Sequence, residues 1–433
     1  VDLKPYVIHT GEKVILIGGM RLGGACGNGN VNPPSDTNES GLDYAGRSAY
    51  FALDITDPQN PEYLWRYAPQ NLGFSYSGPA WIKRKDASGD WDHHVMFMSG
   101  PTDYNGKSTQ NLEIYTLDLL TGTEENVFGD ETSEMNLTNA FGGRLFKQGF
   151  DLNADGQTDF VFLGYTDNAD KSYAKHNGGI IKVYIDSNDP TSWEYDTSFL
   201  SSSIGNPVTA PVKVMNCFAR DLEYPYLYFG TGRYFVSDDE TEEGTSGNDI
   251  NYLYGVPFTC DINNDNCSTI SSIDNASELT CEDLDSLSTN DNQASWKIPL
   301  DSGTGNFLLE RSYSDPTTTD RNIVFFNTSM PTDVTCECGG RARSWAINCA
   351  TGQGLGVEIC GEGNEKYAID QDLQFKYLVQ LSGGDIKQHK ETAFEEEDSG
   401  ATDWNEGVPS EQGGLPTFPP GSISGQILYW KQY

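Results

Sequence analysis

The sequence predicts an all-β protein with the architecture of a β-propeller made of four-stranded blades. Two kinds of strand-like segment alternate along the 433 residues and recur as a unit. No stretch shows the 3.6-residue apolar period of an amphipathic helix over a dozen or more residues. Gly and Pro, at 46 and 20 residues, supply the turns that many short strands require.

The first kind of segment is an apolar run, in most cases closed by Gly, which is typical of a buried strand. In chain order these runs are Lys13–Gly19, His94–Gly100, Asp159–Gly164, Tyr226–Gly230 and Asn322–Asn327. The second kind alternates between apolar and polar residues, and most examples end in a turn signal of Asp or Asn with Thr-Gly or Asp-Pro. These segments are Tyr50–Pro58, Ile114–Gly122, Lys182–Pro190, Tyr252–Val256 and Ser344–Gly352.

Further strands flank these pairs, such as Gly78–Arg84 before one pair and Tyr63–Tyr67 after another. Four strands per repeating unit are the signature of a propeller blade. Five units are visible in the chain, and propellers usually close with more blades. We therefore expect one or two blades upstream of Val1, and we interpret the chain, which has no initiator Met, as a piece of a longer protein.

The predicted organisation is a single propeller domain over residues 1–433, the C-terminal portion of that longer protein. Long polar stretches interrupt the strand pattern and are predicted to be solvated loop insertions. They cover residues 24–46, 236–250, 261–295 and 383–420. The last eight residues, 426–433, are predicted to form a closing strand.

Charge excludes several classes of partner. Lys and Arg total 27 against 64 Asp and Glu, a net charge of −37. A nucleic-acid-binding protein needs a basic surface to neutralise phosphates, and an anionic membrane surface would repel this chain. No apolar run reaches the roughly 18 residues of a membrane span. The balance favours cations as ligands.

The nine cysteines point to an oxidising compartment. They show neither the Cys-x-x-Cys spacing of a zinc site nor a Cys-x-x-Cys-His haem motif. Seven of them fall within 260–281 and 336–360, where disulfides would staple loops. We predict Cys260–Cys267 and Cys349–Cys360, with nine reduced cysteines as the alternative.

One segment has the pattern of a metal-binding loop. It is Asp151-Leu-Asn-Ala-Asp-Gly-Gln-Thr-Asp159. Calcium takes six or more oxygen ligands from a tightly curled loop. The side chains of Asp151, Asn153 and Asp155 alternate and can turn toward one centre, Gly156 permits the bend, the backbone carbonyl of Gln157 can bind, and Asp159 closes the shell. A strand follows in place of the EF-hand's second helix. We predict one Ca²⁺ here, against the alternative of an acidic turn without metal.

The segment Asp261–Cys267 is a weaker copy that lacks the Gly and the final Asp. The sequence does not match the other motifs that would indicate a chemical function. The stretch Gly100–Ser108 imitates a phosphate-binding loop, but its glycines are wrongly spaced and a strand follows where a helix is required. The five histidines show no zinc-protease spacing, and a catalytic triad cannot be inferred from scattered residues. No enzymatic activity is expected.

The sequence resembles the C-terminal β-propeller domain of the PilY family, the type IV pilus tip-associated adhesin and biogenesis proteins. The likeness covers about residues 5–382 and the last strand, and the calcium loop and the Phe-Gly-Thr-Gly-Arg-Tyr segment are its most specific parts. The segments that carry it are Lys13–Gly19, Tyr50–Pro58 with Leu64-Trp65, Leu72–Pro79, Asp151–Asp159, Ala210–Val212, Tyr228–Tyr234, Phe326–Pro331 and Cys338–Gly340.

The resemblance implies a modified seven-bladed propeller and a calcium site that controls pilus extension against retraction. The family's ligands map onto Asp151, Asn153, Asp155, the backbone of Gln157, and Asp159. The implied partners are minor pilins of the pilus tip complex and host or abiotic surfaces, and the implied location is the cell surface or pilus tip, reached through the periplasm. The family's adhesive N-terminal region and any Arg-Gly-Asp motif are absent from this chain.

Two other functions share the scaffold. A free surface adhesin with FG-GAP-like calcium loops would normally repeat the loop in several blades, whereas this chain has one good copy. A quinoprotein-type enzyme would usually contain adjacent cysteines, which this chain lacks.

Overall fold

The structure, a computed structural model, describes a chain of β-strands joined by turns. The described residues are 2–24, 48–130, 135, 137–167, 177–200, 204–217, 224–233, 250–261, 266–269, 277–278, 295–301, 309–312, 314–318, 323–331, 340–350, 352, 360–361, 365–366, 369–372, 374–380 and 386–392. Their helices are two 3₁₀ turns, η1 (Arg21–Gly24) and η3 (Pro190–Ser192). No helix in these ranges is long and apolar enough to span a membrane.

The first two sheets are four-stranded antiparallel meanders, in which each strand pairs with the next along the chain. The first sheet contains β1 (Tyr6–His9), β2 (Val14–Gly19), β3 (Tyr50–Asp54) and β4 (Glu62–Tyr67). The second sheet contains β5 (Ala80–Lys85), β6 (Trp91–Met98), β7 (Ile114–Asp118) and β8 (Glu124–Phe128).

The third sheet repeats this pattern, and the fourth enlarges it. The third contains β9 (Phe141–Gly142), β10 (Phe160–Asp167), β11 (Asn177–Tyr184) and β12 (Glu194–Leu200). The fourth contains β13 (Lys213–Cys217), β14 (Tyr224–Gly230), β15 (Tyr252–Asp261), β16 (Asn266–Thr269), β17 (Ser277–Glu278) and β18 (Trp296–Pro299). Strand β16 pairs with the far end of β15, and β17 runs parallel to β18.

The fifth sheet has the order β19-β20-β21-β24, and two separate strand pairs accompany it. Its strands are β19 (Thr317–Thr318), β20 (Ile323–Pro331), β21 (Gly340–Asn348) and β24 (Ile369–Asp372). The separate pairs are β22 (Cys360–Gly361) with β23 (Glu365–Lys366), and β25 (Gln374–Gln380) with β26 (Ile386–Thr392).

The two kinds of predicted segment form the paired inner strands of the five larger sheets. Strands β2 and β3 pair in the first sheet, β6 and β7 in the second, and β10 and β11 in the third. Strands β14 and β15 pair in the fourth, and β20 and β21 in the fifth. All five predicted units are therefore confirmed as sheets, and the flanking strands around residues 63–67 and 78–84 are confirmed as β4 and β5.

The core lies between consecutive sheets, and one strand shows how it is built. In β6, Val95 and Phe97 pack into the cluster shared with the first sheet, whereas Met96 and Met98 pack into the cluster shared with the third. Both faces of this strand are thus buried, which explains why its sequence is a continuous apolar run. Two further clusters join the third sheet to the fourth and the fourth to the fifth.

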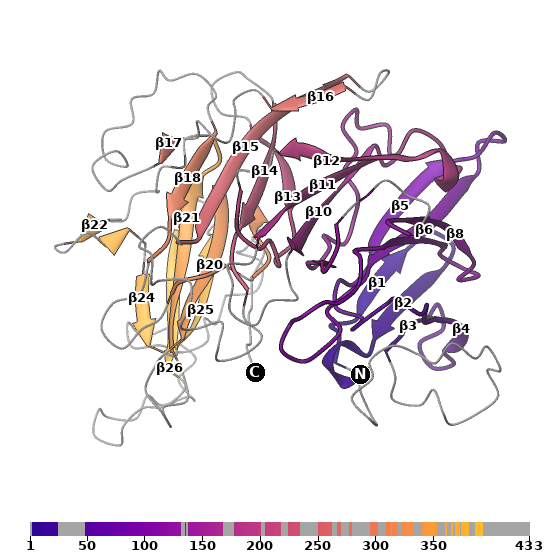
Figure 1. Cartoon of the computed structure of the whole chain (residues 1–433), viewed down its shortest axis with the longest axis horizontal. Coiled ribbons are helices and arrows are strands. Elements are labelled where there is room, and N and C mark those ends of the chain that lie inside the picture. Colours follow the sequence, from indigo (N-terminus) through magenta and orange to yellow (C-terminus); the bar gives the residue numbers. More distant parts are fainter. Residues whose placement is uncertain are drawn as a thin grey trace, which may run out of the picture.

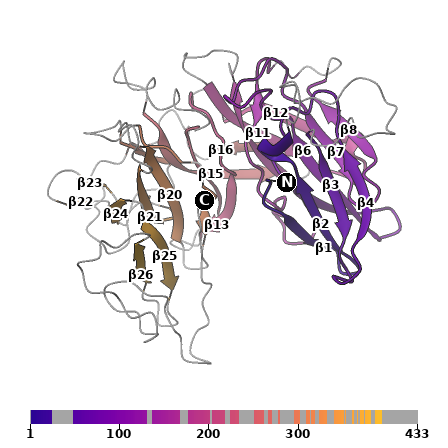
Figure 2. The same cartoon turned by 90° about the horizontal axis from the view of Figure 1, so that it is seen from below.

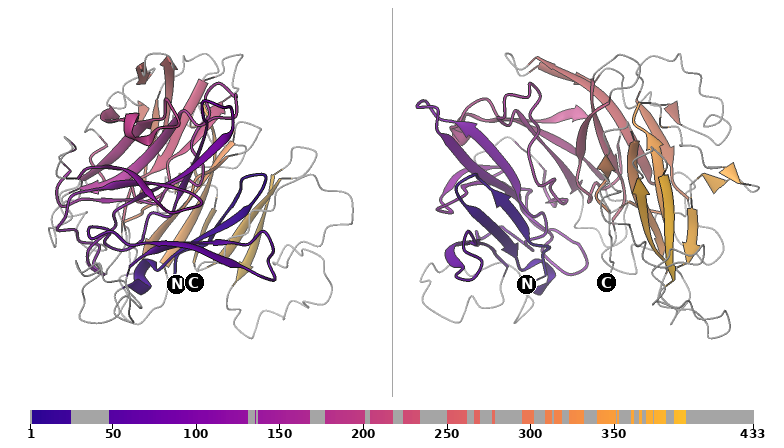
Figure 3. Two further views of the ribbon diagram at one scale, coloured as in Figure 1. Left: turned by 90° about the vertical axis from the view of Figure 1, so that its right-hand side faces the viewer. Right: turned by 180° about the vertical axis from the view of Figure 1, so that it is seen from behind.

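The sheets succeed one another in space in the order of the chain. Figure 1 shows them from β1–β4 on the right, through β10–β15 in the middle, to β20 and β21 on the left. Seen from below and from behind, the first and last sheets stand on opposite sides of the molecule (Figures 2 and 3). Four-stranded meanders stacked face to face in chain order form a β-propeller-like fold, which confirms the predicted fold class.

Several predicted features fall wholly or largely outside the described residues. These are most of the insertions 24–46 and 236–250, and the closing strand 426–433. The other two insertions are described in part and contain strands in addition to loops. Strands β16 and β17 lie within 261–295, and β26 lies within 383–420.

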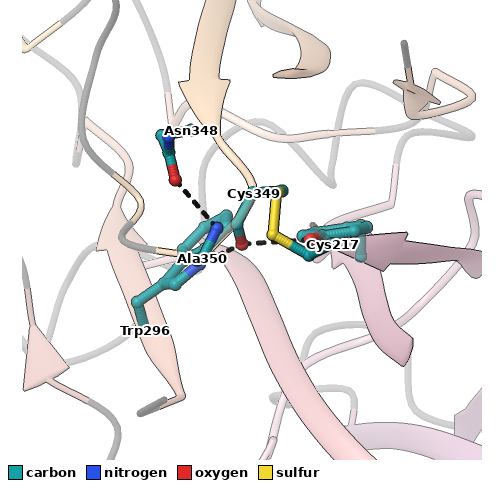
Figure 4. The surroundings of a disulfide bond; sticks show 6 residues. Cys217, Trp296, Asn348, Cys349 and Ala350 are labelled. Atoms are coloured by element: carbon teal, nitrogen blue, oxygen red, sulfur yellow. Dashed lines mark hydrogen bonds between the residues drawn. A yellow bond between two sulfur atoms is a disulfide. The ribbon is translucent and has the colours of Figure 1, made fainter. Parts of the chain in front are cut away.

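Disulfides close one hairpin and join two sheets. Cys260 and Cys267 face each other across β15 and β16 and are bonded, which confirms one predicted pair. The predicted Cys349–Cys360 pair is wrong, because Cys349 is bonded to Cys217, at the end of β13 (Figure 4). The backbone oxygen of Cys349 also accepts hydrogen bonds from Trp296 Nε1 at 3.1 Å and the Tyr228 hydroxyl at 3.0 Å, which fix the chain beside β18 and β14.

Candidate metal centre

The predicted calcium loop, Asp151–Asp159, leaves and rejoins the third sheet at one point. Phe150 and Phe160, on either side of the loop, form an antiparallel bridge. The backbone N–H of Phe150 donates to the Phe160 oxygen at 2.7 Å, and the N–H of Phe160 donates back at 3.1 Å. The N–H of Asp159 donates to the same Phe150 oxygen at 2.8 Å. Strand β10 begins directly after the loop, so the loop is closed at its base by the sheet.

Two residues curl the chain within the loop. Ala154 has φ of 60° and Gly156 has φ of 89°, both in the left-handed region. Glycine adopts this region without steric cost, whereas an alanine there is strained by its Cβ. A strained alanine persists only where the surrounding bonds over-determine the backbone.

Those bonds come from side-chain oxygens turned into the loop. The Asp151 carboxylate accepts from the backbone N–H of Asp155 at 3.2 Å and of Gly156 at 2.8 Å. Asn153 Oδ1 accepts from Asp155 N at 2.9 Å, and Asp155 Oδ1 accepts from Gln157 N at 2.8 Å. Three of the predicted ligand side chains therefore direct oxygen atoms toward the inside of the loop.

Asp159 is the buried member of the set, with 2 % of its surface exposed. Its Oδ2 accepts from Leu152 N at 2.8 Å, and its Oδ1 lies 3.5 Å from the Arg84 guanidinium. Burial raises the pKa of this carboxyl, and the charge of Asp151 adds to the rise, while Arg84 opposes it. A cation at this point would stabilise the ionised form, which burial alone disfavours.

The side-chain amide of Gln157 is used in hydrogen bonds to Lys85 and Asp155. Its Oε1 accepts from Lys85 N at 3.0 Å, and its Nε2 donates to Asp155 Oδ2 at 3.0 Å. Burial opposes a fall in the pKa of Asp155, but the hydrogen bonds from Gln157 and Asn153 lower it below its ordinary value. A contribution of Gln157 to a metal site would thus come from its backbone carbonyl, as the sequence predicts.

The loop is bonded to the edge of the neighbouring sheet. Thr158 N donates to the Lys83 oxygen at 2.9 Å, and Lys83 N donates to the Thr158 hydroxyl at 3.3 Å. Just before the loop, Trp81 and Gln148 form a parallel bridge. The segment that carries the candidate ligands therefore spans the junction between β5 of the second sheet and β10 of the third.

The donor set has the chemistry of calcium ligands, although not their spacing. It contains three carboxylates and an amide oxygen within nine residues, and the backbone is already curled around their oxygens. In the described part of the chain, no three His, Cys, Asp or Glu side chains have the spacing of a metal site. The carboxylates would therefore have to draw closer together around an ion.

The weaker copy of the loop, Asp261–Cys267, lies mostly outside the described residues, because 262–265 are not described. Its two ends are β15 and β16, joined by the disulfide between Cys260 and Cys267.

Sequence reasoning missed Arg84 as a neighbour of the site. Its position in the basic run Lys83-Arg84-Lys85, inside a very acidic chain, was the available signal. It also missed a buried polar cluster in the fifth sheet. There Glu310 pairs with Arg343 at 2.7 Å, and Thr328 contacts the other carboxylate oxygen.

No family model matches the chain. Over 197 residues it is 25 % identical to a type IV pilus biogenesis factor PilY1 homolog of Xylella fastidiosa, a match that covers 45 % of this chain and 14 % of the relative. A second such homolog from the same organism is 23 % identical over 237 residues, which cover 49 % of this chain and 14 % of the relative. The matched stretch is thus a small part of these relatives' length.

The fold is similar to the crystal structure of the Pseudomonas aeruginosa PilY1 C-terminal domain. The TM-score is 0.52 at 17 % identity, and the match covers 90 % of this chain and 82 % of that domain. The sequence and structural comparisons support the resemblance to the C-terminal domain of the PilY family.

Proposed function

We propose that this chain is the C-terminal propeller domain of a PilY-family protein and serves in type IV pilus biogenesis. Two curated relatives are named as PilY1 homologs, and the solved PilY1 C-terminal domain has a similar fold over most of both chains. The five stacked sheets agree with the propeller that this family predicts. The domain is proposed to be a binding module without enzymatic activity.

We further propose that the loop holds one calcium ion through the side chains of Asp151, Asn153, Asp155 and Asp159 and the backbone carbonyl of Gln157. The observation that carries this proposal is the direction of the side-chain oxygens, which already turn into the curled loop. A bound calcium ion would supply the charge that lets three carboxylates share a small volume. The ionised form of the buried Asp159 carboxylate would be stabilised most by the ion, because burial disfavours that form.

The place of the loop suggests how the domain would respond to calcium. Thr158 and Gln157 bond to Lys83 and Lys85 on β5, while Phe160 begins β10. Ligand residues that draw together would shift these bonds and thus the contact between the second and third sheets. Such a local electrostatic change at the junction would couple calcium binding to pilus extension and retraction.

Location and partners follow from the same proposal. The domain would be exported through the periplasm to the cell surface or pilus tip, where disulfides such as Cys217–Cys349 are stable. Its partners would be minor pilins of the tip complex, and surface adhesion would be a function of the whole protein. The acidic surface agrees with an extracellular calcium-binding role.

Calorimetric titration of calcium into the purified chain, with thermal melting alongside, tests the site. One binding event and a rise in the melting temperature are expected, because a ligand of the native state stabilises it by mass action. Asp86→Ala is the control for carboxylate substitutions in the loop. Asp86 accepts backbone N–H bonds in the β5–β6 turn in a similar way, but it lies outside the loop and should leave calcium binding unchanged. Absence of binding in the wild type, or loss of binding in the control, would contradict the assignment.

Pilus association needs a separate test in the organism that encodes the chain. The protein should be recovered with pili sheared from the cells, and its loss should reduce piliation. A protein that stays on the cell surface after shearing, with normal piliation in the deletion strain, would favour a free adhesin.

A further inference from the structure

Arg84 faces the one buried carboxylate of the candidate site. Its Nη1 lies 3.5 Å from Asp159 Oδ1, and the two side chains are 14 % and 3 % exposed. The other carboxylates that act electrostatically on Asp159 are those of Asp151 and Asp155. In this arrangement the guanidinium is the positive charge that offsets the buried acid.

Arg84 is held in this position by two backbone carbonyls as well, one in the loop and one just after β11. Its Nη1 donates to the Thr158 oxygen at 3.0 Å, and its Nη2 donates to the Asp186 oxygen at 2.8 Å. Its Nε is buried and has no hydrogen-bond partner among the described residues. The guanidinium is therefore anchored by carbonyls and does not depend on Asp159 alone for its place.

The neighbouring basic side chains on β5 are directed elsewhere. The ammonium groups of Lys83 and Lys85 lie over the ring of Trp91, 5.3 and 4.9 Å from its centroid. Arg84 is therefore distinguished from its two basic neighbours by the ion pair of its side chain with a predicted ligand.

We propose that Arg84 is an internal counter-ion that competes with calcium for Asp159 and so sets the calcium affinity of the loop. This inference rests on the proposed function, since it concerns the same site. A carboxylate paired with a guanidinium must leave it, or share its charge, to bind a metal ion, and that requirement weakens metal binding. Arg84 is thus a positioning residue and not itself a ligand.

The same contacts link ion binding to the sheet junction. When Asp159 turns toward an ion, its ion pair with Arg84 of β5 is lost. Arg84 keeps its hydrogen bonds to the carbonyls of Thr158 and Asp186, so β5 stays linked to the loop through a neutral acceptor. The competition would also keep the site empty at low calcium, so that the loop responds only when the ion is abundant.

The test compares calcium affinity by calorimetry in three variants of the full 433-residue chain. Arg84→Gln removes the competing charge and is expected to tighten calcium binding about tenfold, on the scale of one charge beside a partly buried carboxylate. Arg84→Lys keeps the charge without the forked geometry and should fall between Arg84→Gln and the wild type, which keeps the test decisive if Arg84→Gln folds poorly. Lys85→Gln removes the same charge from the same strand and should bind as the wild type does.

The outcomes separate this inference from the proposed function. Equal affinity in the wild type and both Arg84 variants would overturn the role of Arg84 and leave the calcium site standing. An equal gain in Lys85→Gln would also overturn it, since any nearby charge would then suffice. Binding in Arg84→Gln alone would support the competition and overturn the calcium site of the natural chain. No binding in any protein would overturn both.

Discussion

Cys217 and Cys349 lie 132 residues apart in the sequence and are joined by a disulfide bond. Cys217 ends β13, the edge strand of the fourth sheet, and Cys349 directly follows β21 of the fifth. Both side chains are buried beside the apolar cluster that these two sheets share. The bond therefore fixes the packing of one blade on the next, whereas Cys260–Cys267 closes a hairpin within one sheet.

The first prediction concerns these two bonds. Replacing Cys217 and Cys349 together by Ser should lower the free energy of unfolding by about 4–5 kcal/mol, because a long loop loses more entropy when it is closed. The matched Cys260→Ser/Cys267→Ser variant closes a much shorter loop and should cost about 2–3 kcal/mol. Urea unfolding without reducing agent measures both. Equal losses would contradict the chain-entropy explanation.

The second prediction concerns the buried ion pair of the fifth sheet. Glu310 is fully buried and bonds to Arg343 at 2.7 Å. Arg343→Met leaves the carboxylate without this partner and should cost about 3–5 kcal/mol of stability. Adding Glu310→Gln removes the stranded charge and should recover part of the loss. A double variant no more stable than Arg343→Met, measured by urea unfolding at neutral pH, would contradict this account.

The third prediction is a pH dependence. Burial lowers the pKa of Lys213 to about 8, although its ammonium lies 3.8 Å from the Phe146 ring centroid. Between pH 8 and the ordinary lysine pKa of about 10.4, the unfolded chain binds more protons than the folded chain, so stability rises with pH. Below pH 8 both states are protonated, and the cost of burying the charge is constant.

The difference in unfolding free energy between the wild type and Lys213→Met isolates this group. It should change in favour of the wild type by at most about 1.4 kcal/mol per pH unit across that window, and should be flat below it. A difference that is constant from pH 7 to pH 10.5 would show that Lys213 titrates normally.

The fourth prediction concerns the loop itself. Asp155→Ala and Asp159→Ala should each abolish calcium binding in calorimetry while the propeller still folds. Their costs to apo stability should differ. Asp155 is exposed, so Asp155→Ala should lower stability by less than about 1 kcal/mol. Asp159→Ala leaves Leu152 N without its acceptor and Arg84 without its carboxylate partner, and should lower stability by about 1–3 kcal/mol. Unchanged calcium affinity in both variants would refute the ligand assignment.

The fifth prediction tests the curl of the loop. Gly156 has φ of 89°, and an added Cβ would lie 3.4 Å from the Trp91 ring. Gly156→Ala should therefore cost about 1 kcal/mol through backbone strain and weaken calcium binding. Gly89→Ala is a suitable control, because Gly89 has the same φ in an open turn outside the loop. It should cost a similar amount of stability without changing calcium affinity.

The sequence predicts the strands well because each inner strand has a pattern that does not depend on distant residues. The run His94–Gly100 is apolar at consecutive positions, and the structure shows why, since Val95 and Met96 enter different clusters. The loop could be found for the same reason, because all its predicted ligands lie within nine residues.

Contacts between distant segments could not be predicted. The partner of Cys349 is set by how the fourth and fifth sheets pack, whereas nearness in sequence favours Cys360. Arg84 meets Asp159 because β5 is bonded to the loop across two sheets. The sequence around Cys349 does not indicate its partner, and the basic run around Arg84 marks that residue without indicating Asp159 as its neighbour.

The bonds between the loop and β5 have one more consequence, for association between chains. Strand β5 is an edge strand of the second sheet, and the segments before and inside the loop occupy its free side through Trp81, Lys83 and Lys85. An uncovered strand edge is a template on which another chain can add a strand. Disruption of the loop would therefore uncover this strand edge, and we expect solubility on storage to decline even where the propeller stays folded.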